Sequence, residues 1–183
     1  GQIVVARANH NVTYPARCQL VAAMNPCRCG DPGEPSRGWG SAPACGRKYA
    51  ARVSGPMIDR FDLIFEVPEV TPATLVAPAA SETTAVIARR IEAARAYAGL
   101  RPQQAADCAN ARLQPDQLAE VMICDDDAAL LLQTAIEQSR LSARAYDKVQ
   151  RVARSTADLK AELTISRATS AEALAYRAMP LLA

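Results

Sequence analysis

The sequence lacks several features that mark common classes of enzyme. Aromatic residues make up only 4% of the 183 residues, and the chain has a single histidine. It contains no Gly-x-x-x-x-Gly-Lys-[Ser/Thr] phosphate loop and no Gly-x-Ser-x-Gly motif. Neither a self-contained phosphate-loop NTPase nor a nucleophile-elbow hydrolase is therefore indicated. The one histidine, His10, lies in the turn-prone segment ANHN and is interpreted as a loop residue rather than a catalytic base.

Long hydrophobic runs and a strong charge of one sign are also missing. No run of about 18 apolar residues is present, so no membrane span is expected. The opening residues GQIVVARANH lack the basic start and long apolar stretch of a signal peptide, and we expect a cytoplasmic protein. The absence of an initiator Met before a strand-like run suggests a fragment. The formal net charge of +2 is too small to indicate DNA binding unless a local basic patch provides it.

The pattern of apolar residues predicts an α/β part followed by an all-α part. Residues 1–70 contain two short β-rich runs, QIVVAR and NVTYP, that favour a hairpin, and two continuous apolar runs, CQLVAAM and FDLIFEV, typical of buried strands. Residues 71–80 are rich in Pro, Thr and Ala and are interpreted as a linker, with a long surface loop as the alternative. Residues 81–183 are predicted to be helical, with helices beginning near Ser81, Asp125, Ser142 and Ser170.

Asn25 follows the first of the two predicted buried strands. Open α/β sheets bind ligands at the carboxyl ends of their strands, where an Asn side chain can orient a water molecule or contact a phosphate. Asn-Pro is also a turn signal by itself. The residue chemistry leaves both interpretations open.

Six cysteines without a secretion signal favour thiols or metal ligands over disulfides. Cys27, Cys29 and Cys45 provide three candidate zinc ligands, whereas structural zinc takes four. A fourth ligand would have to be Cys18, His10 or an outside group. The alternative is a set of thiols that bind no metal.

Two arginines occupy positions that suit phosphate binding. Arg60 lies between Asp59 and Asp62, so it either forms a surface salt bridge or reaches a phosphate of a neighbouring subunit. Arg144 begins a helix on which basic residues recur every three or four positions. This stripe is either a solvated face or a phosphate-binding surface, and its members are Arg140, Arg144, Lys148 and Arg151, with Arg154 nearby.

Four stretches of the chain together resemble the C-terminal half of the magnesium-chelatase-like AAA+ ATPases, in particular the ComM/YifB branch. They are VTYPARCQLVAAMNPCRCG, RVSGPMIDRFDLIFEVP, LSARAYDKVQRVARSTADL and AEALAYR, and they occur in the family's order. The resemblance implies the C-terminal part of an AAA+ α/β core over residues 1–70 and a helical lid domain over residues 81–183. It also implies a homo-oligomeric ring, commonly a hexamer, with nucleotide between the subunits.

The resemblance assigns roles to three residues. Asn25 matches the sensor-1 position, which helps to orient the attacking water. Arg60 matches the arginine finger, which acts on the neighbour's nucleotide, and Arg144 matches the sensor-2 arginine of the lid. The segment GQIVVARANHNVTYPA matches a hairpin that can face the pore.

The chain departs from the family pattern in two places. The phosphate loop and the magnesium-binding carboxylates are missing, so the chain by itself is predicted not to hydrolyse ATP. Relatives often carry two cysteine pairs after sensor 1, but PSRGWGSAPA has no cysteine at the third position. We therefore expect less than one zinc per chain.

The function implied is ATP-driven DNA remodelling, as helicase or in branch migration, by a longer protein that binds ATP and Mg²⁺. Two alternatives are the ATPase subunit of a metal chelatase and a non-catalytic module that binds DNA or protein.

Overall fold

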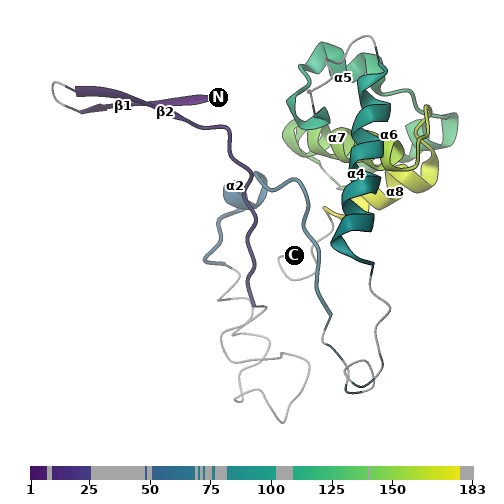
Figure 1. Ribbon diagram of the computed structural model, residues 1–183, viewed down its shortest axis with the longest axis horizontal. Helices are drawn as coiled ribbons and strands as arrows, with labels where there is room; N and C mark the ends of the chain where they lie inside the picture. Colours follow the sequence, from purple (N-terminus) through teal and green to yellow (C-terminus); the bar gives the residue numbers. More distant parts are fainter. Residues whose placement is uncertain are drawn as a thin grey trace. The chain divides into compact units, whose positions relative to one another are not determined.

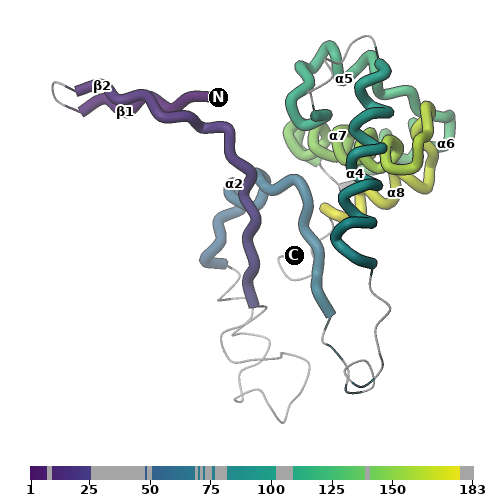
Figure 2. Tube along the Cα trace, viewed as in Figure 1, coloured from purple at the N-terminus to yellow at the C-terminus, as the bar shows by residue number. Residues whose placement is uncertain are grey.

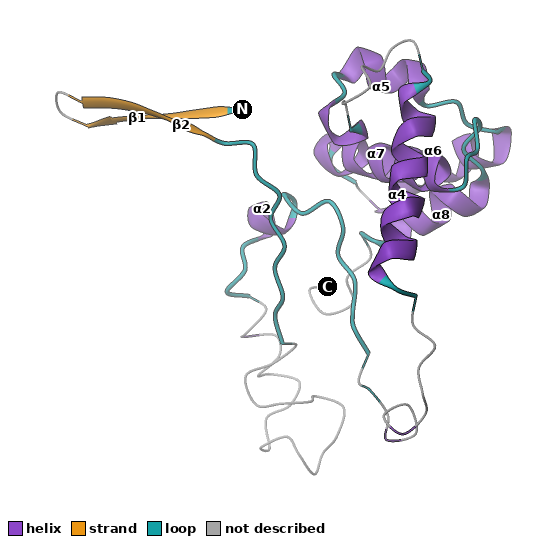
Figure 3. Ribbon diagram, in the orientation of Figure 1, coloured by secondary structure: helices purple, strands orange, loops and turns teal. Residues whose placement is uncertain are grey.

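The structure, a computed structural model, describes residues 1–7, 10–25, 48, 51–68, 70, 72, 76, 82–101, 109–139 and 141–177. The chain divides into two compact units, residues 1–50 and 51–183 (Figures 1 and 2). Helices dominate the second unit, and the only regular element with bounds in the described part of the first is a pair of strands (Figure 3).

The first unit contains the predicted hairpin. Strand β1 (Gln2–Arg7) pairs antiparallel with β2 (His10–Pro15), and the register places Val5 opposite Val12. Every residue of both strands is exposed, although one face carries four large side chains in cross-strand pairs, Ile3 with Tyr14 and Val5 with Val12. An isolated two-stranded hairpin is marginally stable in water, so this apolar face is suited to contact another surface.

The two predicted buried strands are not found. Residues 18–24 form no strand and are all exposed, and residues 61–67 form no strand and are half-buried or exposed. A β-strand is held by hydrogen bonds to a neighbouring strand, and within the described ranges β1 and β2 pair only with each other. The mixed strand and helix content is confirmed, but these residues do not display the α/β core that was predicted for 1–70.

In its described residues, the second unit contains α-helices and one 3₁₀ turn. Their bounds are α2 (Gly55–Ile58), α4 (Thr84–Gly99), η1 (Asn110–Arg112), α5 (Pro115–Val121), α6 (Asp126–Ser139), α7 (Ala143–Leu159) and α8 (Arg167–Ala175). In Figure 1, α4 lies against α7, and α8 packs beside α6 and α7.

Two of the four predicted helix starts, at Asp125 and Ser142, agree with the structure, and a third helix begins close to its predicted start. Helix α4 has Thr83 at its N-cap, while Ser81 lies outside the described residues. Helix α6 follows Asp125, whose carboxylate accepts a hydrogen bond from the Ala128 N–H at 2.7 Å. The side chain of Ser142 caps α7.

The predicted start at Ser170 is wrong. Ser166 accepts a hydrogen bond from the Thr169 N–H and so begins α8 one turn earlier, which leaves Ser170 inside the helix and buried. Helix α5 and η1 were not predicted. In the sequence, Pro115 and the spacing of Gln114 and Gln117 were the local signals for α5. In the structure these two glutamines form the reciprocal hydrogen bonds of a capping box.

Helix α7 is the centre of the hydrophobic core. Val149, Ala153 and Ala157 are fully buried on one face of α7. Leu132, Ile165 and Ala173 complete this cluster from the elements around α7. The loop before α6 is joined to the loop before α8 by backbone hydrogen bonds, because the Ile165 N–H donates to Ile123 and the Asp125 N–H donates to Ile165.

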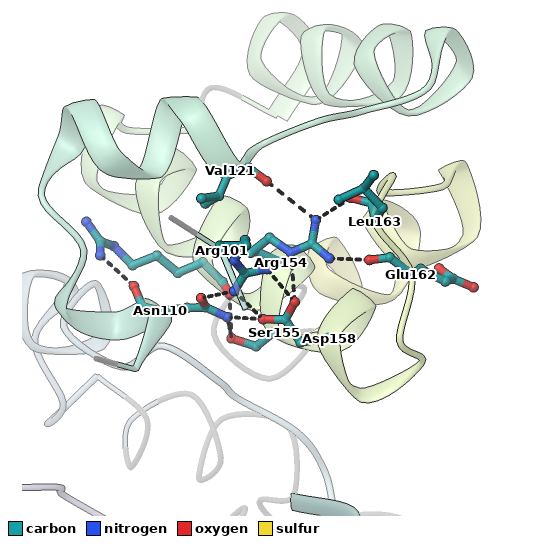
Figure 4. Close-up of polar contacts among 9 residues, drawn as sticks. Arg101, Asn110, Val121, Arg154, Ser155, Asp158, Glu162 and Leu163 are labelled. Atoms are coloured by element: carbon teal, nitrogen blue, oxygen red, sulfur yellow. Dashed lines mark hydrogen bonds and ion pairs between the residues drawn. The ribbon is translucent and has the colours of Figure 1, made fainter. Parts of the chain in front are cut away.

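A buried polar network fixes the C-terminal half of α7 (Figure 4). The Asp158 carboxylate, 4% exposed, accepts hydrogen bonds from Arg101 at 2.6 and 2.9 Å, from Asn110 at 2.7 Å and from Arg154 at 3.1 Å. Arg154 also donates to the carbonyls of Val121, Leu163 and Glu162. The network therefore ties α7 to the ends of α4 and α5 and to the loop before α8.

Burial and charge act in opposite directions on Arg154. Its burial lowers the pKa of the guanidinium, while the neighbouring Asp158 carboxylate raises it. A guanidinium stays protonated under such conditions, so α7 carries a permanent buried cation that requires Asp158.

Candidate functional site

Asn25 ends the described stretch of the first unit. Its side chain is exposed and, within the part of the chain that the structure describes, makes no hydrogen bond. The strand that was expected to precede it is absent there. The proposed sensor role of Asn25 therefore stays a prediction.

The predicted zinc ligands Cys27, Cys29 and Cys45 lie outside the described residues. Of the alternatives for a fourth ligand, Cys18 and His10 are described and are both exposed. Among the described residues, no three His, Cys, Asp or Glu side chains come together as a metal site would require.

Arg60 directly follows helix α2 and keeps most of its guanidinium available. Its Nη1 donates one hydrogen bond, 2.8 Å long, to the carbonyl of Pro56 in the preceding turn. The side chain is exposed and, in the described ranges, forms no ion pair. An Arg side chain has five N–H donors, so a planar anion could still bind to it.

The acidic neighbours of Arg60 pair with other cations. Asp62 accepts from the Lys148 ammonium at 3.2 Å, and Asp59 accepts from Arg177 at 3.2 Å. The interpretation of Arg60 as a surface salt bridge with these two residues is therefore wrong. The physical reason is that two side chains of the helical part compete for the same carboxylates.

Arg144 lies in the first turn of α7, next to the capped N-terminus. The Ser142 hydroxyl accepts the Ala145 N–H at 3.1 Å, which sets the start of the helix. The Arg144 side chain is exposed and makes no hydrogen bond or ion pair to any residue that the structure describes. With no partner among the described residues, the Arg144 guanidinium is available to bind a ligand.

Arg60 and Arg144 are connected through Lys148. The Lys148 ammonium donates to the backbone carbonyl of Arg60. Lys148 lies four residues after Arg144, so the two side chains share one face of α7. The structure thus attaches the Arg60 segment to the face of α7 that carries Arg144.

The other described basic residues of the stripe do not form a solvated face. Arg151 binds Asp147 in bidentate fashion and donates to the carbonyls of Asn110 and Leu113. Arg154 is buried, and Arg140 lies outside the described residues. Lys148, Arg151 and Arg154 therefore use their charges in contacts within the protein. Of the described residues of the stripe, Arg144 is the one whose charge is available to a ligand.

An open cavity of about 690 Å³ adjoins these residues. Residues 62–65, η1, α7 and α8 line it, with Leu63, Phe65 and Leu159 among its apolar side chains and Lys148 and Arg151 among its charged ones. Leu63 and Phe65 are 49% and 70% exposed. The segment after Arg60 is therefore poorly packed against the helices on its apolar side.

Sequence reasoning missed the roles of Lys148 and Arg177. Lys148 was recognised only as part of the stripe, and Arg177 only as the end of AEALAYR. The bond from Lys148 to Arg60 spans 88 residues and that from Arg177 to Phe61 spans 116. No local periodicity reports contacts of that range, although the excess of acids around Arg60 was a signal that cations were needed there.

No helix in the described ranges is long and apolar enough to cross a membrane. This finding agrees with the expectation from the sequence.

Comparison with protein families gives two matches in succession. Residues 1–75 match the model for magnesium chelatase, subunit ChlI, and residues 81–177 match the model for the C-terminal part of the same subunit.

Similar proteins occur in several bacteria. Competence protein ComM of Haemophilus influenzae is 36% identical over 181 residues, which cover 98% of this chain and 34% of the relative. The uncharacterised protein YifB of Salmonella typhimurium is 36% identical over 184 residues, covering 100% of this chain and 35% of the relative. An uncharacterised protein of Mycobacterium tuberculosis is 34% identical over 177 residues, covering 97% and 35%. The chain thus spans about a third of the length of these relatives.

Proposed function

Because this chain belongs to the magnesium chelatase ChlI family, we propose that it is part of a ring-forming AAA+ ATPase that uses ATP to remodel DNA. The observation that carries the proposal is the state of Arg60. Its backbone is held by the helical part, its acidic neighbours are paired elsewhere, and its guanidinium keeps free donors. A positioned guanidinium with free donors supports the assignment of Arg60 as an arginine finger.

The exposed guanidinium groups fit the phosphate part of ATP. An Arg side chain is planar and permanently charged and binds phosphate oxygens with two parallel hydrogen bonds. Arg60 would neutralise charge that develops on the phosphate bound by a neighbouring subunit. Arg144 would hold a phosphate oxygen from α7, and Asn25 would orient water. ATP supplies the phosphoryl group, and a phosphate loop and magnesium-binding carboxylates, neither of which is present in this sequence, would hold ATP and Mg²⁺.

The DNA part of the proposal relies on the ComM-like relatives and on the hairpin. One relative at 36% identity is named a competence protein. The hairpin exposes all of β1 and β2, and Arg7 pairs with His10 beside its turn. We propose that this hairpin contacts DNA in the pore of a ring, the hexamer that the resemblance implies.

The proposal is tested with Arg60→Ala in the intact ATPase that contains this chain. Loss of a finger should lower turnover by about 10³-fold or more and leave ATP affinity unchanged. The matched control is Arg90→Ala, which removes an exposed Arg of α4 that pairs with Glu82 at 3.0 Å. If Arg60→Ala turns over ATP as fast as Arg90→Ala does, the finger assignment is wrong.

A second candidate, the ATPase subunit of a metal chelatase, is favoured by the description of both matched families. The effect of added DNA on the rate of ATP hydrolysis distinguishes these two candidate functions. A DNA-remodelling motor should hydrolyse ATP faster when DNA is added, whereas a chelatase subunit should respond to a metal-binding partner and not to DNA. An intact protein that binds DNA but never hydrolyses ATP would instead support the non-catalytic module.

A further inference from the structure

We propose that Lys148 and Arg177 form a clamp that couples the helical part of the protein to the position of Arg60. The clamp consists of these two cations and the segment Asp59–Asp62, which carries Arg60 at its centre. The inference rests on the proposed function, because it adds positioning residues and a route of regulation to the same arginine.

Lys148 holds the C-terminal side of the segment. Its ammonium donates to the Arg60 carbonyl and lies 3.2 Å from the Asp62 carboxylate. The Lys148 side chain is 12% exposed, compared with 67% for Asp62. The Lys148 ammonium is therefore held against α7 by its surroundings, and the exposed Asp62 is the partner that is free to move away from it.

Arg177 holds the N-terminal side in the same manner. Its Nη1 donates to the Phe61 carbonyl at 2.6 Å and its Nη2 to the Asp59 carboxylate at 3.2 Å. The Arg177 side chain is 8% exposed. It follows α8 directly, and the Ile64 N–H donates to the Tyr176 carbonyl at 2.9 Å. Each cation thus binds one carbonyl and one carboxylate of the segment.

Apolar packing does not replace these contacts. Asp62, Leu63 and Phe65 line the cavity of about 690 Å³ together with residues of α7 and α8, and the side chains of Leu63 and Phe65 are exposed. A segment that is held by a few polar bonds and little buried surface opens more easily than a packed one. Moving α7 or α8 would therefore shift Arg60 directly.

The clamp would let phosphate binding at Arg144 regulate the position of Arg60. Lys148 shares its helix face with Arg144, which is proposed to bind phosphate. A phosphate at Arg144 that shifts α7 would change the contact of Lys148 with the Arg60 carbonyl, and so the placement of Arg60. Two sites are coupled only when a shared element has two arrangements. In this proposal that element is the clamp, closed when both cations bind the segment and open when they release it.

The first test uses hydrogen exchange in the chain itself and needs no ATP. Lys148→Ala and Arg177→Ala should each speed exchange of the Phe61 and Ile64 amides by about tenfold or more, as expected for loss of a charge-assisted hydrogen bond. Lys148→Arg, which keeps a cation, should restore part of the protection. The matched control is Lys160→Ala, which removes a lysine at the other end of α7 whose ion pair with Glu172 is 3.3 Å long. Unchanged exchange in both clamp variants would overturn the clamp, whatever the ATPase does.

The second test measures turnover in the intact ATPase. Lys148→Ala should lower kcat with little change in KM, and Lys148→Ala with Arg60→Ala should be no slower than Arg60→Ala alone, because the lysine acts through the arginine. A double variant much slower than Arg60→Ala would contradict this route. Normal turnover of Arg60→Ala would instead reject the proposed function, and with it the coupling, even if the exchange result shows that the clamp exists.

Discussion

At the scale of single residues, the Asp158 carboxylate is the common acceptor of the buried polar network in the helical part. Arg101, Asn110 and Arg154 all donate to it. The sequence shows Arg154 and Asp158 at helical spacing, but Arg101 and Asn110 come from 57 and 48 residues away. A local pattern therefore predicted one ion pair at most and could not predict a network.

Asp158→Asn keeps the shape of the side chain and removes its charge. Because this leaves the buried cation Arg154 without its carboxylate, we expect the free energy of unfolding to fall by about 3–5 kcal/mol. Urea denaturation followed by circular dichroism measures it. Glu82→Gln, at an exposed ion pair with Arg90, should cost less than about 1 kcal/mol. If Asp158→Asn and Glu82→Gln lowered the free energy of unfolding equally, the stability of the network would not depend on the charge of Asp158.

Cys124 should be a slow nucleophile. Burial raises the pKa of its thiol, and the neighbouring Asp125 raises it further. A raised pKa lowers the thiolate fraction near pH 8, and the thiolate is the reactive form. Cys18, which is exposed, should therefore be alkylated by iodoacetamide first, as measured by peptide mass spectrometry over time. Faster labelling of Cys124 than of Cys18 would contradict the burial of this thiol.

At the scale of elements, most of the long helices and the hairpin were predicted correctly, whereas the two predicted buried strands are absent from the described residues, for a physical reason. A helix forms its hydrogen bonds within one segment, and the residue that caps its start can be recognised in the sequence. Asp125 and Ser142 are such caps for α6 and α7. A central strand depends on hydrogen bonds to neighbouring strands, which can come from any part of the chain. The apolar runs at residues 18–24 and 61–67 thus indicated a need for burial without saying what provides it. The hairpin was predictable because its two strands are adjacent.

Ser142→Ala tests the start of α7. The variant removes the bond from the Ala145 N–H to the Ser142 hydroxyl, and loss of such a cap costs about 1 kcal/mol. The control is Thr83→Ala, because Thr83 occupies the N-cap of α4 without a side-chain hydrogen bond and its loss should cost much less. Thermal unfolding of both variants gives the comparison, and a larger effect at Thr83 would be inconsistent with the capping geometry.

At the scale of the whole molecule, the family resemblance predicted from four motifs is confirmed by the matches over residues 1–75 and 81–177. Of the candidate site, sequence reasoning named Arg60 and Arg144, and the structure adds the contacts of Lys148 and Arg177 with the segment around Arg60. The sequence placed Lys148 in the basic stripe but could not predict these contacts, because they span 88 and 116 residues.

Zinc content tests the incomplete cysteine set. With Cys27, Cys29 and Cys45 as the candidate ligands and no cysteine at the third position of the pattern, elemental analysis of the purified chain should find less than one zinc per chain. Structural zinc requires four ligands. One zinc per chain, lost when Cys27 is changed to Ser, would show that another group completes the site.

The central claim is that Arg60 acts on a nucleotide held by a neighbouring subunit. Mixing two inactive forms of the intact ATPase tests it most directly: one carries Arg60→Ala, and the other carries a substitution in the phosphate loop. A mixed ring contains interfaces at which an intact phosphate loop meets an intact Arg60, about one in four for equal amounts. The account predicts that ATP hydrolysis returns on mixing. Two forms that stay inactive together, although they assemble into one ring, would contradict it.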